Sequence, residues 1–226
     1  MLNQRRRKVL ANIGIDYWVS RKEVEVEVEQ KHTCLEESDL ILLEQQVRSC
    51  TKCQLHKTRV KTVFGVGDDR ANLMIVGEAP GAQEDKLGEP FVGKAGQLLD
   101  RMLRAIGLRR EQVYIANVLK CRPPENRDPD PSEILCCKGY LESQIVRVAP
   151  SVILAVGRVA AHSMLGTDDG IGQLRSNVHS LHSLVGSDIP VVVTYHPAYL
   201  LRSPLEKSKV WIDLKKVVAL LEDDEA

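Results

Sequence analysis

Short apolar runs alternate with longer amphipathic segments along most of the chain. Four runs, at 72–76, 112–120, 151–157 and 190–195, are rich in Val, Ile and Leu, as strands buried on both faces are. Helical spacing of apolar positions predicts helices from about residue 38, over 96–106, from a cap at Ser132, over 158–165 and over about 205–221. Strands that alternate with helices predict a parallel sheet covered by helices on both faces.

The first part of the chain departs from this pattern. It begins with a basic stretch, Arg5 to Lys8, and ends with strict alternation of Glu and Val over 23–29. The alternation fits an edge strand or a solvated linker, and we favour the linker because one face is entirely glutamate. We therefore expect an amino-terminal arm and linker at 1–37 and one domain at 38–226.

Composition narrows the class of protein. The 226 residues suffice for one α/β domain with a full core. The formal net charge is zero, so any binding of nucleic acid must use a local basic patch. No apolar run has the length of a membrane span, and no signal-peptide core follows the basic amino terminus. We expect a cytoplasmic monomer that does not associate with membranes.

A glycine-rich segment follows the first predicted strand. It contains GEAPG at 77–81 and GEPFVG at 88–93, with Glu78, Glu84, Asp85 and Phe91 as its acidic and aromatic side chains. It lacks the Gly-Lys-Ser/Thr of a phosphate loop and the GxGxxG of a dinucleotide site. It fits a surface loop that needs glycine, but its place between strand and helix favours a ligand pocket at the strand's carboxyl end.

The chain has six cysteines, which in the cytosol favour metal ligation over disulfides. Cys50 and Cys53 form a CxxC pair, Cys121 ends the second predicted strand, and Cys136 and Cys137 lie in the helix after it. Four of these thiolates can hold a tetrahedral zinc or an iron–sulfur cluster. Spacing alone chooses neither the metal nor the fourth ligand, and Cys34 is interpreted as a cysteine without a ligand role.

Several motifs occur together in register. They are CTKCQL at 50–55, VFGVG at 63–67, GEAPG at 77–81, GEPFVGKAGQLL at 88–99, YIANVLKCRPPENR at 114–127, a cysteine before Gly139-Tyr140-Leu141, and HPAYLLR at 196–202. Over about residues 38–220 the chain resembles the family 4 uracil-DNA glycosylases, the iron–sulfur type. The resemblance implies a three-layer α/β/α sandwich with a four-stranded parallel central sheet. It also implies one [4Fe-4S] cluster whose ligands are Cys50, Cys53, Cys121 and Cys137. Cys137 is chosen over Cys136 because it is the cysteine that matches the family's position before the Gly-Tyr-Leu motif.

The resemblance also implies a chemistry. A monofunctional glycosylase flips deoxyuridine out of DNA, hydrolyses its N-glycosidic bond and leaves an abasic site for base excision repair. Phe91 would stack on the uracil, Asn117 would pair with its edge, His196 would hydrogen-bond the uracil O2, and Glu78 would orient water or stabilise the sugar cation. The substrate-binding residues would be Gly77, Glu78, Ala79, Phe91, Asn117 and His196. Ala79 stands where the family often has glycine, and Glu84 and Asn126 match further positions near the site.

Contacts with DNA are expected on the loops at the strand ends. Phosphate contacts would come from basic side chains there, and an apolar side chain after His196 would fill the space that the base leaves. The candidates are Lys94, Arg122, Asn126, Arg127, Tyr199, Leu200 and Arg202.

The arm carries a second resemblance. Residues 13–21, around Trp18, are similar to the peptide of the polymerase III psi subunit that docks on the chi subunit, so chi is an expected partner. The alternative function is a non-catalytic, psi-like replication subunit or scaffold of the same fold that carries an iron–sulfur cluster. A third interpretation is a zinc-bound nucleic-acid module.

Overall fold

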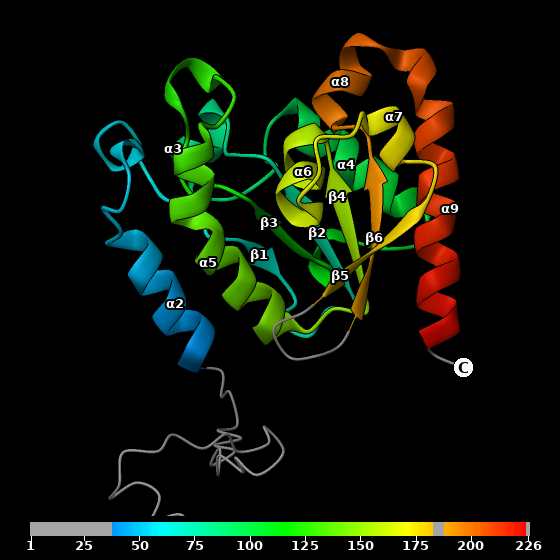
Figure 1. Ribbon diagram of the computed structural model, residues 1–226, viewed down its shortest axis with the longest axis horizontal. Helices are drawn as coiled ribbons and strands as arrows, with labels where there is room; N and C mark the ends of the chain where they lie inside the picture. Colours follow the sequence, from blue (N-terminus) through cyan, green and yellow to red (C-terminus); the bar gives the residue numbers. More distant parts are fainter. Residues whose placement is uncertain (1–37, 183–187, 225–226) are drawn as a thin grey trace, which may run out of the picture. The chain divides into compact units, whose positions relative to one another are not determined.

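The computed structural model describes residues 38–182 and 188–224, so the arm around Trp18 and Cys34 lie outside the described residues. The described part forms a six-stranded sheet with the order β1-β3-β2-β4-β6-β5 (Figure 1). The strands are β1 (Val66–Gly67), β2 (Leu73–Gly77), β3 (Tyr114–Asn117), β4 (Val152–Val156), β5 (Val178–His182) and β6 (Asp188–Thr194).

The four predicted strands are confirmed and are mutually parallel, as β3, β2, β4 and β6 at the centre of the sheet. The sheet nevertheless has six strands and not four, because β1 and β5 pair antiparallel along its two edges. β1 has only two residues. β5 alternates exposed and half-buried residues and includes two histidines and a serine, so no apolar run marks it.

Helices connect the strands. They are α2 (Ser38–Arg48), α3 (Ala82–Leu87), α4 (Lys94–Ala105), α5 (Pro131–Val148), α6 (Arg158–Leu165), α7 (Ile171–Leu174), α8 (Pro197–Arg202) and α9 (Lys207–Asp224). Among residues 38–182 and 188–224, no helix combines the length and apolarity that crossing a membrane requires.

The cap predicted at Ser132 is wrong. α5 begins earlier, with Pro131 as its first residue and Asp130 as its cap. The Glu133 carboxylate accepts the Asp130 N–H at 2.9 Å. Proline suits the first helical position because its missing N–H would have no partner there, so the helix starts before the serine.

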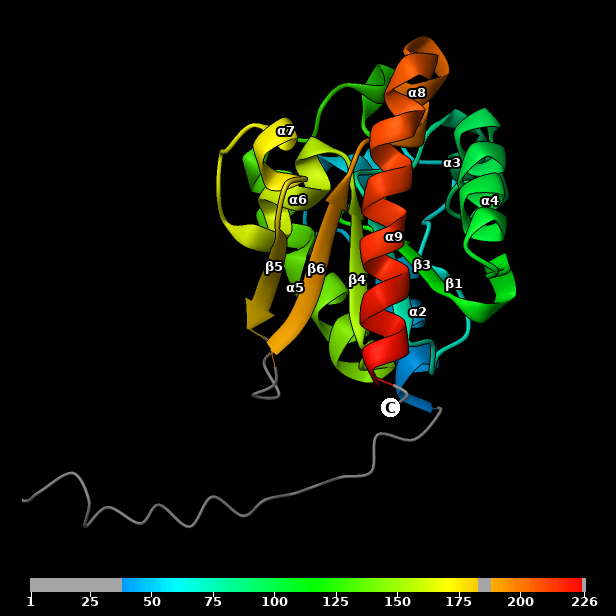
Figure 2. The same ribbon diagram turned by 90° about the vertical axis from the view of Figure 1, so that its right-hand side faces the viewer.

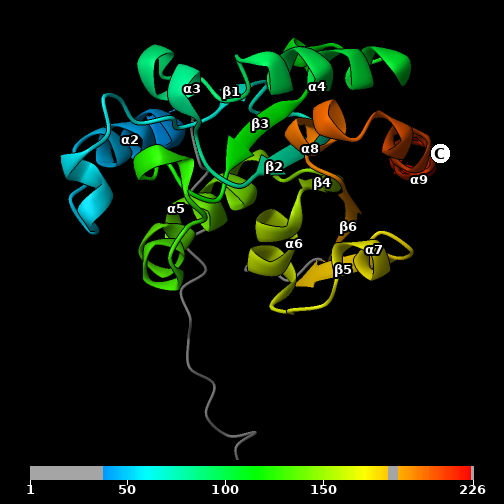
Figure 3. The same ribbon diagram turned by 90° about the horizontal axis from the view of Figure 1, so that it is seen from above.

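Alternate residues of each central strand face opposite helical layers. On one face, Leu73 and Ile75 of β2 pack with α4, α8 and α9; on the other, Met74 and Val76 pack with α5, α6 and α7. Figure 3 shows the two helical layers on either side of the sheet. The expected three-layer α/β/α arrangement is therefore confirmed.

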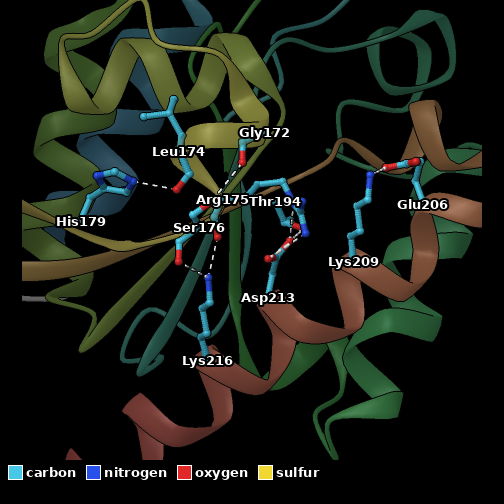
Figure 4. Close-up of polar contacts among 10 residues, drawn as sticks. All are labelled: Gly172, Leu174, Arg175, Ser176, His179, Thr194, Glu206, Lys209, Asp213 and Lys216. Carbon is cyan, nitrogen blue, oxygen red and sulfur yellow. Dashed lines mark hydrogen bonds and ion pairs between the residues drawn. The ribbon is translucent and has the colours of Figure 1, made fainter.

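The buried Asp213 carboxylate on α9 binds both Arg175, which follows α7, and Thr194 at the end of β6. Arg175 Nε and Nη2 donate hydrogen bonds to Asp213 at 2.7 and 3.0 Å, and the Thr194 hydroxyl donates to the same carboxylate at 2.7 Å (Figure 4). Asp213 is 1% exposed. Thr194 is the last residue of β6, which runs toward α8 (Figure 2), so its hydrogen bond to Asp213 holds the strand end that precedes His196.

Candidate active site

A cavity of about 480 Å³ lies at the carboxyl ends of β2, β3 and β6. Parallel α/β sheets bind ligands at this edge because the loops that follow neighbouring strands meet there. The cavity is lined by Glu78, Ala79, Gly81, Glu84, Phe91, Ala95, Asn117, Asn126, His196, Ala198, Tyr199 and Arg202.

The structure brings together three side chains from three separate segments. A β-carbon built on Gly77 would lie 2.3 Å from Asn117 Oδ1 and 2.6 Å from Phe91 Cζ, so both side chains reach over this glycine. The rings of Phe91 and His196 lie 5.7 Å apart between centroids, with 29° between their planes. Asn117 is 3% exposed and Phe91 is 6% exposed. One wall of the cavity therefore combines a flat aromatic ring, an amide and an imidazole.

Phe91 has an unusual backbone that its surroundings hold in place. Its φ of +53° lies in the left-handed region, which bulky residues seldom adopt. Arg110 Nη1 donates to the Phe91 carbonyl at 3.2 Å, and Nη2 donates to the Pro90 carbonyl. A β-carbon on Gly96 would lie 1.7 Å from the Phe91 oxygen, so only glycine fits beneath it. Sequence reasoning missed Arg110, because nothing local marks an arginine that acts across the fold.

His196 is the cap of α8 and is neutral. The Ala198 N–H donates a hydrogen bond to its Nδ1 at 3.1 Å, so the ring proton resides on Nε2. Burial, assisted by the positive charge of Arg202, lowers the pKa of His196 to about 4. The side chain can thus donate a hydrogen bond from Nε2 while carrying no net charge.

Glu78 is one of two half-buried carboxylates that line the cavity, the other being Glu84. Burial raises its pKa, and Asp128 adds to this effect while Arg158 opposes it. Arg158 and Asp128 form an ion pair of 2.7 Å. Sequence reasoning did not identify this pair, whose members are 30 residues apart.

The two neighbouring acids of α3 hold loops. Glu84 Oε1 accepts the N–H groups of Val92 and Gly93 at 3.0 and 3.1 Å, which fixes the segment that follows Phe91. Asp85, 2% exposed, accepts the N–H groups of Val60 and Lys61 at 2.9 and 3.3 Å. Together the two carboxylates tie the cavity loop to the segment that follows the CxxC pair.

Five cysteines line a second, smaller cavity: Cys50, Cys53, Cys121, Cys136 and Cys137. Arg59 Nη1 donates to Cys121 Sγ at 3.0 Å, and the Lys120 N–H donates to Cys137 Sγ at 3.3 Å. Burial raises the pKa of the Cys137 thiol to about 11 and also raises those of Cys53 and Cys121. Within residues 38–182 and 188–224, no three His, Cys, Asp or Glu side chains are arranged to hold a single metal ion.

The packing distinguishes the two adjacent cysteines of α5. Cys137 packs in one apolar cluster with Cys50 and in another with Cys53 and Cys121. Cys136 lines the same cavity but belongs to neither cluster. Of the two cysteines of α5, Cys137 is therefore the one that packs together with Cys50, Cys53 and Cys121.

The candidates for DNA contact fall into two groups. Arg202, Tyr199 and Asn126 line the cavity, and Lys94 is exposed beside it at the start of α4. Arg122 donates to Asn126 Oδ1 at 2.8 Å, so its guanidinium lies next to the cavity rim.

Two other candidates are already engaged within the fold. Arg127 donates to both oxygens of Glu133 at 2.9 and 2.6 Å and pairs with Asp130 at 3.2 Å, which neutralises its charge. Leu200 is 1% exposed and packs in the core, so it is not available as a wedge. Its neighbours Tyr199 and Leu201 are exposed by 36% and 46%. Helical spacing explains the difference, because consecutive residues of α8 face different directions.

Comparison with known proteins gives a consistent result. The family model described as the uracil DNA glycosylase superfamily matches residues 64–215. The type-4 uracil-DNA glycosylase of Archaeoglobus fulgidus is 46% identical over 176 residues, which are 76% of this chain and 88% of that protein. The type-4 enzyme of Thermotoga maritima is 44% identical, over 72% of this chain and 83% of that protein. That of Saccharolobus solfataricus is 42% identical, over 79% and 85%. With its α/β/α fold, its cavity at the strand ends and these relatives, the chain belongs to the uracil-DNA glycosylase superfamily and, within it, to the type-4 enzymes.

Proposed function

We propose that this protein is a monofunctional DNA glycosylase that releases uracil from DNA and leaves an abasic site for base excision repair. The observation that carries the proposal is the convergence of Phe91, Asn117 and His196 on one cavity that also contains Glu78. Its volume of about 480 Å³ lies in the range of pockets that enclose small ligands.

Base recognition is assigned to Phe91 and Asn117. A glycosylase takes its target nucleotide out of the stack and reads it inside a pocket. The Phe91 ring offers a face on which the planar base stacks. The Asn117 amide both donates and accepts hydrogen bonds, which suits the edge of uracil, where cytosine presents the opposite pattern. Gly77 lets both side chains approach, and Ala79 adds one methyl group to the pocket wall.

Departure of the base is assigned to His196. Cleavage of the N-glycosidic bond leaves negative charge on uracil, part of it on O2. A neutral imidazole that donates from Nε2 stabilises this charge without neutralising the anion by full proton transfer. The hydrogen bond from Ala198 to Nδ1 orients the ring for that role.

Attack by water is assigned to Glu78. The sugar acquires positive charge at C1′ as the bond breaks, and a carboxylate stabilises that cation and orients the water. The water oxygen bonds to C1′, its proton is released, and uracil takes up one proton after departure, so the reaction is a net hydrolysis. Among the described residues that line the cavity, none is a lysine, which agrees with base release without strand cleavage.

A [4Fe-4S] cluster is proposed on Cys50, Cys53, Cys121 and Cys137. The donor set fits, since thiols around one cavity match the four-cysteine ligation of such clusters, in which each thiolate binds a different iron. A single zinc would instead draw all four sulfur atoms to about 2.3 Å from one ion. The cluster would cross-link the CxxC segment, the segment that follows β3, and α5.

DNA binding is assigned to the rim of the cavity. Arg202, Lys94 and Arg122 would contact phosphates, which fix position without reading sequence, and Asn126 would lie beside them. Tyr199 or Leu201 would fill the space that the flipped base leaves. Leu200 and Arg127 are not assigned contacts, because the first is buried and the second is paired within the fold.

The amino-terminal arm is proposed to dock on the chi subunit of a bacterial replicative polymerase through the residues around Trp18. The support is the resemblance of residues 13–21 alone. A pull-down with chi that Trp18→Ala leaves unchanged would exclude this partner without affecting the proposed enzymatic activity.

One experiment tests the enzyme and its cofactor together. The purified protein is incubated with single- and double-stranded DNA containing uracil, free uracil is measured, and the visible spectrum is recorded. We expect uracil release, broad visible absorption, and loss of most release in Asn117→Ala and His196→Ala. A brown protein that releases no uracil would support the scaffold function, and a colourless one that binds zinc would support the zinc module.

A further inference from the structure

Lys120 occupies an unusual place for a lysine. It lies just beyond the end of β3 and is 1% exposed. Its Nζ donates hydrogen bonds to the backbone oxygen of Asn117 at 2.8 Å and to Oε1 of Gln144. Gln144, itself 0% exposed, donates onward to the Phe64 carbonyl and the Tyr114 hydroxyl, both at 3.0 Å. The ammonium group is therefore part of a fully buried polar network.

The two groups that accept hydrogen bonds from Lys120 carry no negative charge to balance an ammonium group. Lysine is almost never fully buried unless it is paired, because removing an ammonium ion from water is costly. Both acceptors of Lys120 are neutral, one a carbonyl and the other an amide. In the part of the chain that the structure describes, no carboxylate forms an ion pair with it. The structure therefore buries the Lys120 amine among neutral acceptors, and its ammonium form would be stabilised by a negatively charged group nearby.

The cysteine cavity lies directly beside it. Lys120 lines that cavity, its backbone N–H donates to Cys137 Sγ at 3.3 Å, and Cys121 is the next residue. An iron–sulfur cluster held by four thiolates has a net negative charge, because the thiolates outweigh the charge of its core. A buried ammonium next to such a group is stabilised by it, and in return favours the more negative, reduced state of the cluster.

We propose that Lys120 is a positioning residue that joins the two sites: its ammonium is the buried counter-charge of the cluster and holds the backbone of Asn117 in place for uracil recognition. The inference rests on the proposed function, since it presumes both the cluster and the base-reading role of Asn117. The hydrogen bonds around Asn117 support the positioning role of Lys120. The N–H groups of Val118 and Leu119 donate to the carbonyls of Gly77 and Glu78, and Lys120 Nζ donates to the carbonyl of Asn117 itself at 2.8 Å.

The test is Lys120→Met, which removes the charge and the donor while keeping the backbone N–H to Cys137. In cluster-loaded protein we expect the midpoint potential of the cluster to fall. We also expect kcat/KM for uracil release to fall by about tenfold or more, because small displacements of a recognition group are costly. The matched control is Lys138→Met, the same substitution beside Cys137 at an exposed side chain that pairs with Glu142. It should change neither quantity.

A second variant, Gln144→Glu, separates the effect on the cluster's charge from the effect on the position of Asn117. It places a carboxylate beside the ammonium, so the potential should fall while the contact with Asn117, and with it uracil release, is kept. The proposal is overturned if Lys120→Met retains its cluster and has the same midpoint potential and the same kcat/KM as Lys138→Met. If Lys120→Met does not fold, an unchanged potential in Gln144→Glu overturns it. Failure of the proposed function is seen separately, as absence of uracil release or of visible absorption in the unaltered protein.

Discussion

Gly77 lies directly beneath Asn117: a β-carbon at position 77 would stand 2.3 Å from the Asn117 side-chain oxygen. The same β-carbon would stand 2.6 Å from the Phe91 ring. No real β-carbon tolerates such contacts, so one added methyl group must displace the amide, the ring or both. Strand β2 thus ends in glycine because the two recognition side chains occupy the space above Gly77.

Gly77→Ala is therefore expected to lower kcat/KM for uracil release by on the order of 100-fold, since displaced recognition groups lose their alignment with the base. The measurement is release of free uracil under steady-state conditions. Gly139→Ala is the control, because a β-carbon there meets no atom within 4 Å. It should leave release unchanged and, as a helix-interior exchange, raise stability by up to about 1 kcal/mol. Equal activity of the two variants would contradict the packing argument.

The ionisation of His196 gives a prediction about pH. Its pKa of about 4 in the folded protein lies below the value of about 6.5 expected in the unfolded chain. Between these values the unfolded chain binds a proton that the folded protein does not, so stability rises with pH across this window. Denaturant unfolding should show a smaller gain from pH 5 to pH 7 in His196→Asn than in the unaltered protein. An NMR titration that gives His196 a pKa near 6.5 would refute the assignment of a neutral ring.

The sequence predicted the central strands because long apolar runs mark buried strands. It predicted the convergence of Phe91, Asn117 and His196 because their motifs occur in the order and at the spacing of a known family. It did not predict β5, whose alternating polar residues resemble a loop. Arg110, Arg158 and Lys120 were also missed. Their partners lie elsewhere in the fold, and a lysine within an apolar run looks like the end of a strand until its burial is known. Leu200 was misplaced because its neighbours on α8 look equally apolar in sequence.

The adjacent cysteines of α5 offer an internal comparison. Cys137→Ser should lose the broad visible absorption, because Cys137 packs with Cys50, Cys53 and Cys121. Cys136→Ser should retain it, since this side chain belongs to neither cluster. The measurement is the ratio of visible to protein absorbance after purification without oxygen. Retained absorption in Cys137→Ser with loss in Cys136→Ser would reverse the ligand assignment.

The buried pair of Arg175 and Asp213 should be a large contributor to stability. Asp213→Ala leaves the guanidinium without its partner in a site where Arg175 is 8% exposed, and breaking such a pair costs about 3–5 kcal/mol. Glu142→Ala, which breaks the exposed pair with Lys138, should cost less than about 1 kcal/mol. Denaturant unfolding of both variants measures the difference, and similar losses would mean that the buried pair has no special role.

Two arginines near the cavity should differ in their effect on DNA binding. Arg202 is exposed at the rim, whereas Arg127 is held by Glu133 and Asp130. A phosphate contact releases counterions, so Arg202→Ala should weaken binding uniformly across sequences and reduce the slope of log affinity against log salt by about 1. Arg127→Ala should leave that slope unchanged, because its charge is already neutralised within the fold. Titrations of a uracil-free duplex at several salt concentrations measure both slopes without interference from catalysis. A reduced slope in Arg127→Ala would show that its ion pair opens on DNA and would restore it as a phosphate contact.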